Sequence, residues 1–271
     1  NPRASRTVPF VSKATGVQLA KAAVMIGLGK SIAELKAEGY LPKNMDGASL
    51  PQNTAIAVKA AVLPFSRFRT PEGVVVDSLL SPEMRSTGEV MGLDALYDTA
   101  FAKAQAGAGS PLPTEGKVFV SVANHDKRNV IIYAKMLEQL GFEIVSTGGT
   151  ADVLRRNGVN STVASKFAEA NGQHSIVDMV RNGEIDLILN TPAGGAARSD
   201  GYEIRAAAVS VGCPVMTTIS EFAAAVQAIT ALRERSWEII NLQEHGEFLR
   251  TASTREQGQD KDEQAREGEL S

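Results

Sequence analysis

Short apolar runs and helical patterns alternate through the second half of the chain, and this alternation restricts the fold more than any other feature. Runs typical of strands occupy residues 117–123, 142–146, 161–165, 185–191 and 214–218. Helical patterns occupy residues 126–141, 150–158, 174–183, 203–212 and 220–232, and a last extended run covers residues 237–243. Strands and helices that alternate with short connections form parallel sheets through right-handed crossovers. We therefore expect an α/β fold with a parallel five-stranded sheet and flanking helices.

The first part of the chain lacks this alternation and does not have the pattern of a self-contained domain. Glycines interrupt a helical pattern at residues 16–35, and residues 54–65 are typical of a buried strand. Residues 81–92 resemble a loop, and residues 95–109 a helix. Residues 107–116 have the composition of a linker.

Composition excludes several classes of protein. The chain has 271 residues and a formal net charge of −3, so no broad basic surface for nucleic acid is expected. Cys213 is the only cysteine, which excludes a disulfide within the chain and fits a reducing cytoplasm. No apolar run has transmembrane length, and no signal peptide opens the chain. We therefore expect a cytoplasmic protein that does not associate with a membrane. From Thr251 the chain is polar and charged, and we expect a disordered tail over residues 251–271.

Polar side chains follow every predicted strand, at the edge where open parallel sheets bind their ligands. They are Lys127 after the first strand, Thr147 and Thr150 after the second, Lys166 after the third, Asn190 and Thr191 after the fourth, and Thr217 and Thr218 after the fifth. Hydroxyls, amides and two lysines would thus converge on one edge. This convergence predicts a site for a small anionic ligand.

The run Thr147-Gly148-Gly149-Thr150 allows two interpretations. Glycines before a helix let backbone N–H groups approach a phosphate, where the helix dipole also favours an anion. The alternative is an ordinary strand-to-helix turn, with threonine as a helix cap and lysines that only meet solvent.

Other groups point to recognition without chemistry. His125, His174 and His245 have spacings that match no metal motif. Asp178 and Asp186 fit a helix surface and a strand start better than a catalytic site. No general base or nucleophile is evident beside the predicted anion site.

Several runs of residues resemble the large chain of carbamoyl-phosphate synthase. "NPRASRTVPFVSKATG" at residues 1–16 is similar to the end of that family's second ATP-grasp domain, and "LPFSRF" and "SPEMRSTGEVMG" are similar to the motifs that follow. "DKRNV", "STGGTADVL" and "NTPAGG" resemble its regulatory domain, which has a methylglyoxal-synthase-like (MGS-like) fold. The resemblance identifies the chain as a C-terminal fragment of this family. It implies the end of the carbamoyl-phosphate-forming ATP-grasp domain at residues 1–107, an allosteric domain at 108–250 and the tail at 251–271.

The resemblance also implies roles for single residues. Asn1 is similar to a Mg²⁺ ligand at the ATP site, and Arg3 and Arg6 stand where phosphate-facing arginines are found. In the allosteric domain, the positions that match those holding a nucleoside monophosphate are Lys127, Thr147, Thr150, Lys166 and Asn190, with Thr191 in the same loop. In bacterial members the ligand is UMP, an inhibitor, or IMP, an activator.

For the full chain, the resemblance implies an ATP-dependent ligase that uses Mg²⁺ or Mn²⁺. It would make carbamoyl phosphate from bicarbonate, glutamine-derived ammonia and two ATP, for pyrimidine and arginine biosynthesis. Its implied partners are the rest of the large chain and a small glutaminase subunit, in an oligomer. The fragment alone is expected to be inactive.

Two departures from the family pattern affect these expectations. Members activated by ornithine carry a glutamate where this chain has Ala60, so ornithine activation is not expected. Between Lys166 and Asn190 the chain is two residues longer than some members. The alternatives to a sensor domain are a stand-alone lyase of the methylglyoxal synthase type, which needs a carboxylate base, and the cyclohydrolase domain of purine synthesis. The segment at residues 1–16 fits neither.

Overall fold

The computed structural model describes residues 5–43, 55–64, 86–164, 175–191 and 197–245. The chain divides into two compact units, one of residues 1–59, 91–100 and 237–271 and the other of residues 60–90 and 101–236. The domain limits expected from the sequence stay predictions. Within the described residues, no helix is both long enough and apolar enough to cross a membrane.

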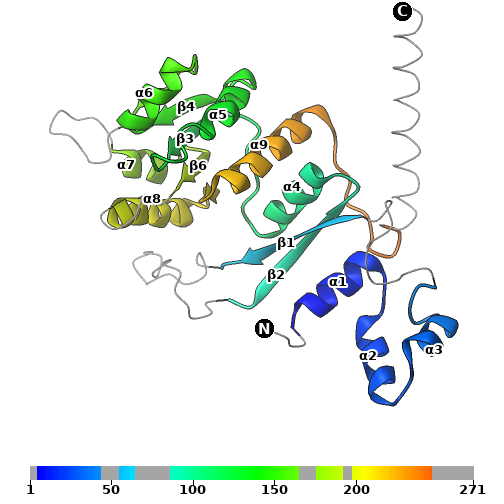
Figure 1. The fold of residues 1–271 in the computed structure, drawn as a ribbon. Coiled ribbons are helices and arrows are strands. Elements are labelled where there is room, and N and C mark those ends of the chain that lie inside the picture. The colour runs from blue at the N-terminus through cyan, green and yellow to red at the C-terminus, as the bar shows by residue number, and fades with distance from the viewer. Residues whose placement is uncertain (1–4, 44–54, 65–85, 165–174, 192–196, 246–271) are drawn as a thin grey trace, which may run out of the picture. The chain divides into compact units, whose positions relative to one another are not determined.

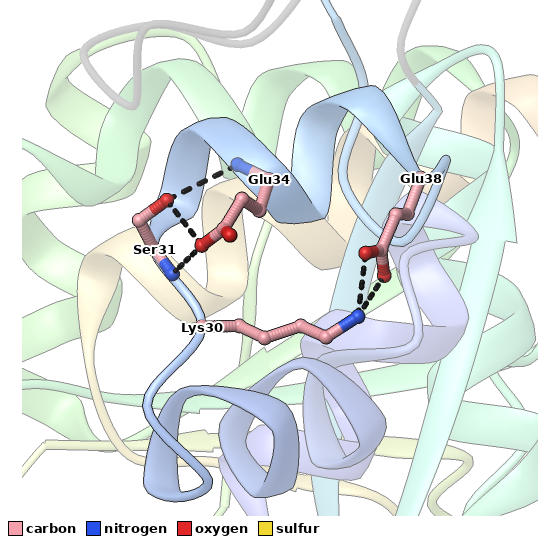
Figure 2. A network of polar contacts seen from close by, with 4 residues as sticks. All are labelled: Lys30, Ser31, Glu34 and Glu38. Atoms are coloured by element: carbon pink, nitrogen blue, oxygen red, sulfur yellow. Dashed lines mark hydrogen bonds and ion pairs between the residues drawn. The ribbon is translucent and has the colours of Figure 1, made fainter.

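Three short helices open the first unit: α1 (Thr7–Thr15), α2 (Leu19–Gly27) and α3 (Ile32–Ala37). The expected helical pattern at residues 16–35 is therefore two helices, because the chain turns at Gly29, whose φ is +96°. Figure 2 shows the start of α3, where Glu34 N donates to Ser31 Oγ at 3.3 Å and Ser31 N donates to Glu34 Oε2 at 2.8 Å. Lys30 bonds the carboxylate of Glu38 beside this capping box. The helix start thus satisfies its own backbone donors.

A two-stranded sheet and a helix follow: β1 (Ile56–Val62), β2 (Gly88–Asp94) and α4 (Tyr97–Gly107). The strand expected at residues 54–65 is present, but the expectation that it is buried is wrong. Its side chains are exposed or half-buried, since alanines and Lys59 give it little apolar surface to cover. The loop expected at residues 81–92 is also wrong over residues 88–92, which belong to β2; residues 81–85 lie outside the described part.

The second unit contains a sheet in which every neighbouring pair of strands is parallel. Its strands are β3 (Lys117–Ser121), β4 (Glu143–Ser146), β5 (Thr162–Val163), β6 (Leu187–Asn190) and β7 (Val215–Met216), and the spatial order is β5-β4-β3-β6-β7. The helices are α5 (Val130–Gln139), α6 (Gly148–Arg156), α7 (Ile176–Arg181), α8 (Ala197–Val211) and α9 (Ile219–Glu234). The expected α/β fold with a parallel five-stranded sheet is confirmed.

Helices cover both faces of this sheet (Figure 1): α5, α6 and α9 lie on one face, and α7 and α8 on the other. Phe119, Val145 and Ile188 belong to the core cluster under α7 and α8. Because side chains alternate along a strand, their buried neighbours Val118 and Leu187 face the opposite helices. Burial on both faces explains why these strands are continuous apolar runs in the sequence.

Asp186 ties the two central strands together at their start. Its carboxylate accepts from Lys117 N at 2.7 Å, and a Cβ at Gly116 would lie 2.0 Å from Asp186 Oδ2. Gly116 also has φ +116°, so two independent constraints require glycine there. The strand-start interpretation of Asp186 agrees with this contact.

Three expected boundaries are wrong. The helix expected from residue 126 begins only at Val130, as α5, after a turn in which the Asp126 carbonyl accepts from Val130 N. Helix α8 begins at Ala197 instead of residue 203, because a glycine and polar residues obscure its first turns in the sequence. The extended run expected at residues 237–243 forms no strand: residues 237–241 have no regular secondary structure, and a turn begins at residue 242.

Candidate functional site

The candidate site lies at the carboxyl edge of the parallel sheet, beside its central strands. From β3 the chain crosses to β4, whereas from β6 it crosses to β7 on the other side. Crossovers that leave in opposite directions open a crevice between two strands, and ligands of open α/β sheets bind there. The strand order therefore places this crevice at the ends of β3 and β6.

A row of polar side chains crosses the ends of three neighbouring strands. Ser121 on β3 is the register partner of Asn190 on β6, and Ser121 Oγ shares a 3.3 Å hydrogen bond with Thr147 Oγ1, just after β4. Thr147 Oγ1 also donates to Thr150 Oγ1 at 3.4 Å, and Thr150 Oγ1 lies 3.5 Å from its donor Val122 N. Thr147 and Thr150 therefore meet, as the sequence predicted.

The start of α6 leaves its backbone donors without a side-chain cap. Thr147 occupies the N-cap position with extended backbone, yet its hydroxyl makes no capping bond. Gly148 and Gly149 form the first turn, and both are exposed. The backbone N–H groups of Gly148 and Gly149 thus face solvent at the positive end of the helix dipole, where an anion is favoured.

The glycines act differently from the expectation. Neither has a positive φ, so backbone freedom does not explain them. A Cβ at Gly149 would lie 3.0 Å from Lys127 Nζ, whereas a Cβ at Gly148 would meet nothing within 4 Å. Gly149 therefore leaves room for the Lys127 ammonium against the first turn of α6.

Lys127 also borders a cavity of about 640 Å³ between α5 and α6. Its lining is rich in cationic and amide side chains: Asn124, Lys127, Arg128, Ile131, Val153, Arg156 and Asn157. Lys127 lies beside the uncapped start of α6, and Arg128 and Arg156 add positive charge to the cavity lining. This positive charge suits a phosphate and opposes a cation.

Asn190 and Thr191 form the other side of the crevice. Thr191 Oγ1 accepts from Ala123 N at 2.8 Å, and Thr191 N donates to the Ser121 carbonyl at 3.1 Å. Asn190 is only 7% exposed, and its Oδ1 accepts from Arg205 Nη1 at 2.9 Å. Both residues are thus fixed at the edge of the sheet.

A second cavity, of about 760 Å³, opens on the same edge toward α9. It is lined by His125, Asp126, Arg128, Asn129, Ile132, Tyr133, Thr191, Thr217, Thr218, Ile219 and Ser220. Its mixture of hydroxyls, an aromatic ring and Ile132 suits a sugar or base better than a bare anion. Thr191 borders this cavity, so the crevice continues into it.

Burial changes the pKa of two side chains near the site's supporting helix. The pKa of Arg205 is lowered by burial, although a guanidinium remains charged at neutral pH. Burial, with a smaller contribution from Asp186, raises the pKa of the Cys213 thiol to about 12. Cys213 is therefore neutral and is a poor nucleophile.

Some predicted site residues cannot be placed in this geometry. Asn1, Arg3 and Lys166 lie outside the described residues, and so does His174. Arg6 is the residue before α1 in the other unit. In the described part of the chain, no group of three or more potential metal ligands comes together.

Two residues of the site, Ser121 and Arg205, carry no signal in the sequence that marks them. Ser121 is the last residue of an apolar strand, and its hydroxyl was not distinguished from the strand around it. Arg205 lies within the second half of α8, fifteen positions after Asn190, so only the packing of α8 on β6 brings the two together.

Known proteins have sequences similar to this chain. Residues 129–217 match the family model of the MGS-like domain. The carbamoyl phosphate synthase large chain of Kocuria rhizophila is 65% identical over 262 residues, which cover 96% of this chain and 24% of that protein. The large chain of Pseudarthrobacter chlorophenolicus is 66% identical over 253 residues (92% and 23%), and that of Streptomyces griseus 56% over 255 residues (93% and 23%). This chain spans about a quarter of the length of these relatives. Its resemblance to carbamoyl phosphate synthase large chains is therefore confirmed, and residues 129–217 form an MGS-like domain.

Proposed function

We propose that the MGS-like domain binds a nucleoside monophosphate, UMP or IMP, at the carboxyl edge of its sheet. The observation that carries the proposal is the start of α6, where uncapped N–H groups, the Thr147 hydroxyl and the Lys127 ammonium converge. A phosphate accepts hydrogen bonds from all three kinds of donor. Lys166 is proposed as a further cation at this site, as the family resemblance implies.

The neighbouring cavity supports a nucleotide over a free phosphate. Its walls carry Tyr133, Ile132 and several hydroxyls, and it adjoins Thr191 at the crevice. A ribose and base could occupy this space while the phosphate lies at α6. Thr191 would stand between the two parts of the ligand.

We also propose an activity for a whole chain of this family. Such a chain would be an ATP-dependent ligase that makes carbamoyl phosphate with a small glutaminase subunit, in the cytoplasm. Mg²⁺ or Mn²⁺ would act at the ATP site, with Asn1, Arg3 and Arg6 contributing to it. The nucleotide would then adjust carbamoyl phosphate synthesis as an allosteric effector. Ala60 supports the further proposal that ornithine is no activator.

Calorimetric titration of the 271-residue chain with UMP, IMP and inorganic phosphate tests the binding proposal. We expect a nucleotide to bind more tightly than phosphate. The Thr150 hydroxyl is a proposed hydrogen-bond partner of the phosphate, and Thr150→Val removes it. Binding should weaken about tenfold to a hundredfold, since charge-assisted hydrogen bonds contribute about 1.5–3 kcal/mol. Thr150→Ser keeps the hydroxyl and should bind nearly as the unmutated chain does.

Two results would count against the proposal. One is an unmutated chain that binds neither nucleotide, and the other is equal affinity in Thr150→Val and Thr150→Ser. Incubation with dihydroxyacetone phosphate separates a sensor from a lyase, because only a lyase of the methylglyoxal synthase type would release methylglyoxal and phosphate.

A further inference from the structure

The carboxamide of Asn190 is held by an arginine from another element. Arg205 lies on α8, and its Nη1 donates to Oδ1 of Asn190, the last residue of β6, at 2.9 Å. Asn190 is 7% exposed, so its side chain has little freedom to move away from this contact. The contact joins the edge of the sheet to the helix that covers it.

Gly201 makes space for this hydrogen bond. It lies one helical turn before Arg205 on α8, and a Cβ there would lie 2.7 Å from Arg205 Nη1 and 2.8 Å from Asn190 Oδ1. Both distances are too short for a carbon atom beside either group. Since glycine is one of the least favourable residues within a helix, this close approach gives a physical reason for its presence in α8.

The contact determines which end of the carboxamide faces the ligand. A guanidinium has donors and no acceptor, so it can only bond the oxygen of an amide. If the amide turned over, its NH₂ group would meet the guanidinium donors and the hydrogen bond would be lost. No partner for Asn190 Nδ2 lies among the described residues, and the strand register puts Asn190 beside Ser121, whose hydroxyl bonds that of Thr147.

We propose that Arg205 and Gly201 are positioning residues that hold the Asn190 carboxamide with its NH₂ group toward the ligand, so that the site selects a hydrogen-bond acceptor there. This inference rests on the proposed nucleotide site. It adds the contact that decides whether Asn190 presents a hydrogen-bond donor or an acceptor to the ligand. The group that meets Asn190 is then a phosphate oxygen or a carbonyl oxygen of the ligand, and never an amino group. Arg205 acts through Asn190 and needs no contact with the ligand itself.

A double-mutant cycle separates this role from a general structural one. Arg205→Met should weaken UMP or IMP binding about tenfold, because the Asn190 carboxamide would no longer be held in the orientation that donates a hydrogen bond to the ligand. In an Asn190→Ala background, Arg205→Met should have no further effect, because there is no amide left to orient. An equal effect of Arg205→Met in both backgrounds would overturn the proposal.

Asn190→Asp tests the polarity directly. Its carboxylate can still accept from Arg205, but it presents no donor to the ligand. We expect it to bind nucleotide no better than Asn190→Ala. Retention of full affinity in Asn190→Asp would contradict a donor role for Asn190.

A measurement without ligand keeps the inference testable if the chain binds no nucleotide. The side-chain ¹H–¹⁵N signals of Asn190 should shift in Arg205→Met and in Gly201→Ala. They should stay unchanged in Arg156→Met, which removes a cation from the last residue of α6. Absent nucleotide binding with these shifts would refute only the proposed function, whereas unshifted signals in both variants would refute the positioning role.

Discussion

Two helices of the same domain begin with threonine at the same edge of one sheet, and they use it in different ways. Thr147 precedes α6 and Thr218 precedes α9, and both have the extended backbone of an N-cap residue. The Thr218 hydroxyl accepts from Glu221 N at 3.1 Å, whereas the Thr147 hydroxyl makes no capping bond. The start of α9 is thus capped by its own side chain, whereas the start of α6 has no side-chain cap.

The residue three positions after each threonine accounts for the difference. At α9 it is Glu221, whose carboxylate accepts from Thr217 N at 3.0 Å and adds negative charge at the helix start. At α6 it is Thr150, which has no charge and instead bonds Thr147. A helix start that carries its own carboxylate has no need of an external anion. The comparison teaches that threonine alone does not decide between a cap and an anion site.

The largest effect is expected when α6 is given the acid of α9. Thr150→Glu would place a carboxylate where the phosphate is proposed to bind, and like charges in contact cost several kcal/mol. We expect UMP and IMP affinity to fall by more than about a hundredfold in calorimetric titration. Thr150→Gln has a side chain of nearly the same size without the charge, so it is the matched control. Equal losses in the two variants would show that size, and not charge, closes the site.

Removal of the cation beside α6 should have the next largest effect. Lys127→Met keeps much of the side chain but loses the ammonium that lies against Gly149. Affinity should decrease about tenfold to a hundredfold, and the remaining binding should depend less on salt. Lys135→Met changes an exposed lysine on α5 and should bind normally. If both variants behave alike, the positive charge of the domain as a whole would explain the attraction better than a specific contact.

The two threonines can then be compared directly. Thr218→Ala removes a cap and should lower the free energy of unfolding by about 1 kcal/mol, with nucleotide affinity nearly unchanged. Thr147→Ala should lower the affinity, since its hydroxyl is a proposed phosphate donor. Chemical denaturation and calorimetry on both variants measure the two quantities. Comparable losses of affinity would mean that Thr218, which also lines the larger cavity, takes part in binding.

The centre of the sheet could be predicted from the sequence because strands β3, β4 and β6 are largely buried. Residues 118–120 and 187–189 are continuous apolar runs, and glycines end the helices between the strands. The prediction that strand β1 is buried was wrong because its side chains carry less apolar surface than those of the central strands. Half of its apolar residues are alanines, whose small side chains cover little surface, so the pattern does not show how much of the strand is buried.

The site could be predicted only where its residues follow strands directly. Thr147, Thr150 and Asn190 stand at strand ends, and the order of a parallel sheet brings such positions to one edge. Arg205 could not be found in this way, because its contact with Asn190 depends on how α8 is rotated on the sheet. The role of Gly149 was also inaccessible, since the sequence does not show that the Lys127 ammonium approaches it.

Gly149→Ala should have smaller effects, which are opposite for the stability of the fold and for nucleotide affinity. Alanine favours the helix over glycine by up to about 1 kcal/mol, so the free energy of unfolding should rise. Its Cβ would crowd Lys127 Nζ at 3.0 Å, so nucleotide affinity should decrease a few-fold. Gly148→Ala gains a similar helix preference in open space and serves as the control for stability. A Gly149→Ala chain that is more stable and binds nucleotide equally well would mean that Lys127 need not lie where it does.

The smallest effect concerns a capped start in the other unit, at α3. Hydrogen bonds from Ser31, first from its backbone N–H and then from its side chain, lower the pKa of Glu34 below its ordinary 4.5. A carboxyl group whose pKa is lowered by folding stabilises the folded state above its unfolded pKa. That contribution is lost as the pH falls through the lowered value. The start of α6 has no acid at the equivalent position, so it should contribute no such dependence.

Ser31→Ala should move the pKa of Glu34 part of the way back toward 4.5, because the side-chain hydrogen bond is lost while the backbone donor remains. An NMR titration of the Glu34 carboxyl carbon between pH 2 and 7 measures the shift directly. Lys30→Ala, which removes only a distant charge, should move it less, since the Lys30 charge is the weakest of the influences on Glu34. A pKa that is the same in Ser31→Ala and in the unmutated chain would show that the capping box adds nothing electrostatic to α3, and the contrast with α6 would then rest on hydrogen-bond geometry alone.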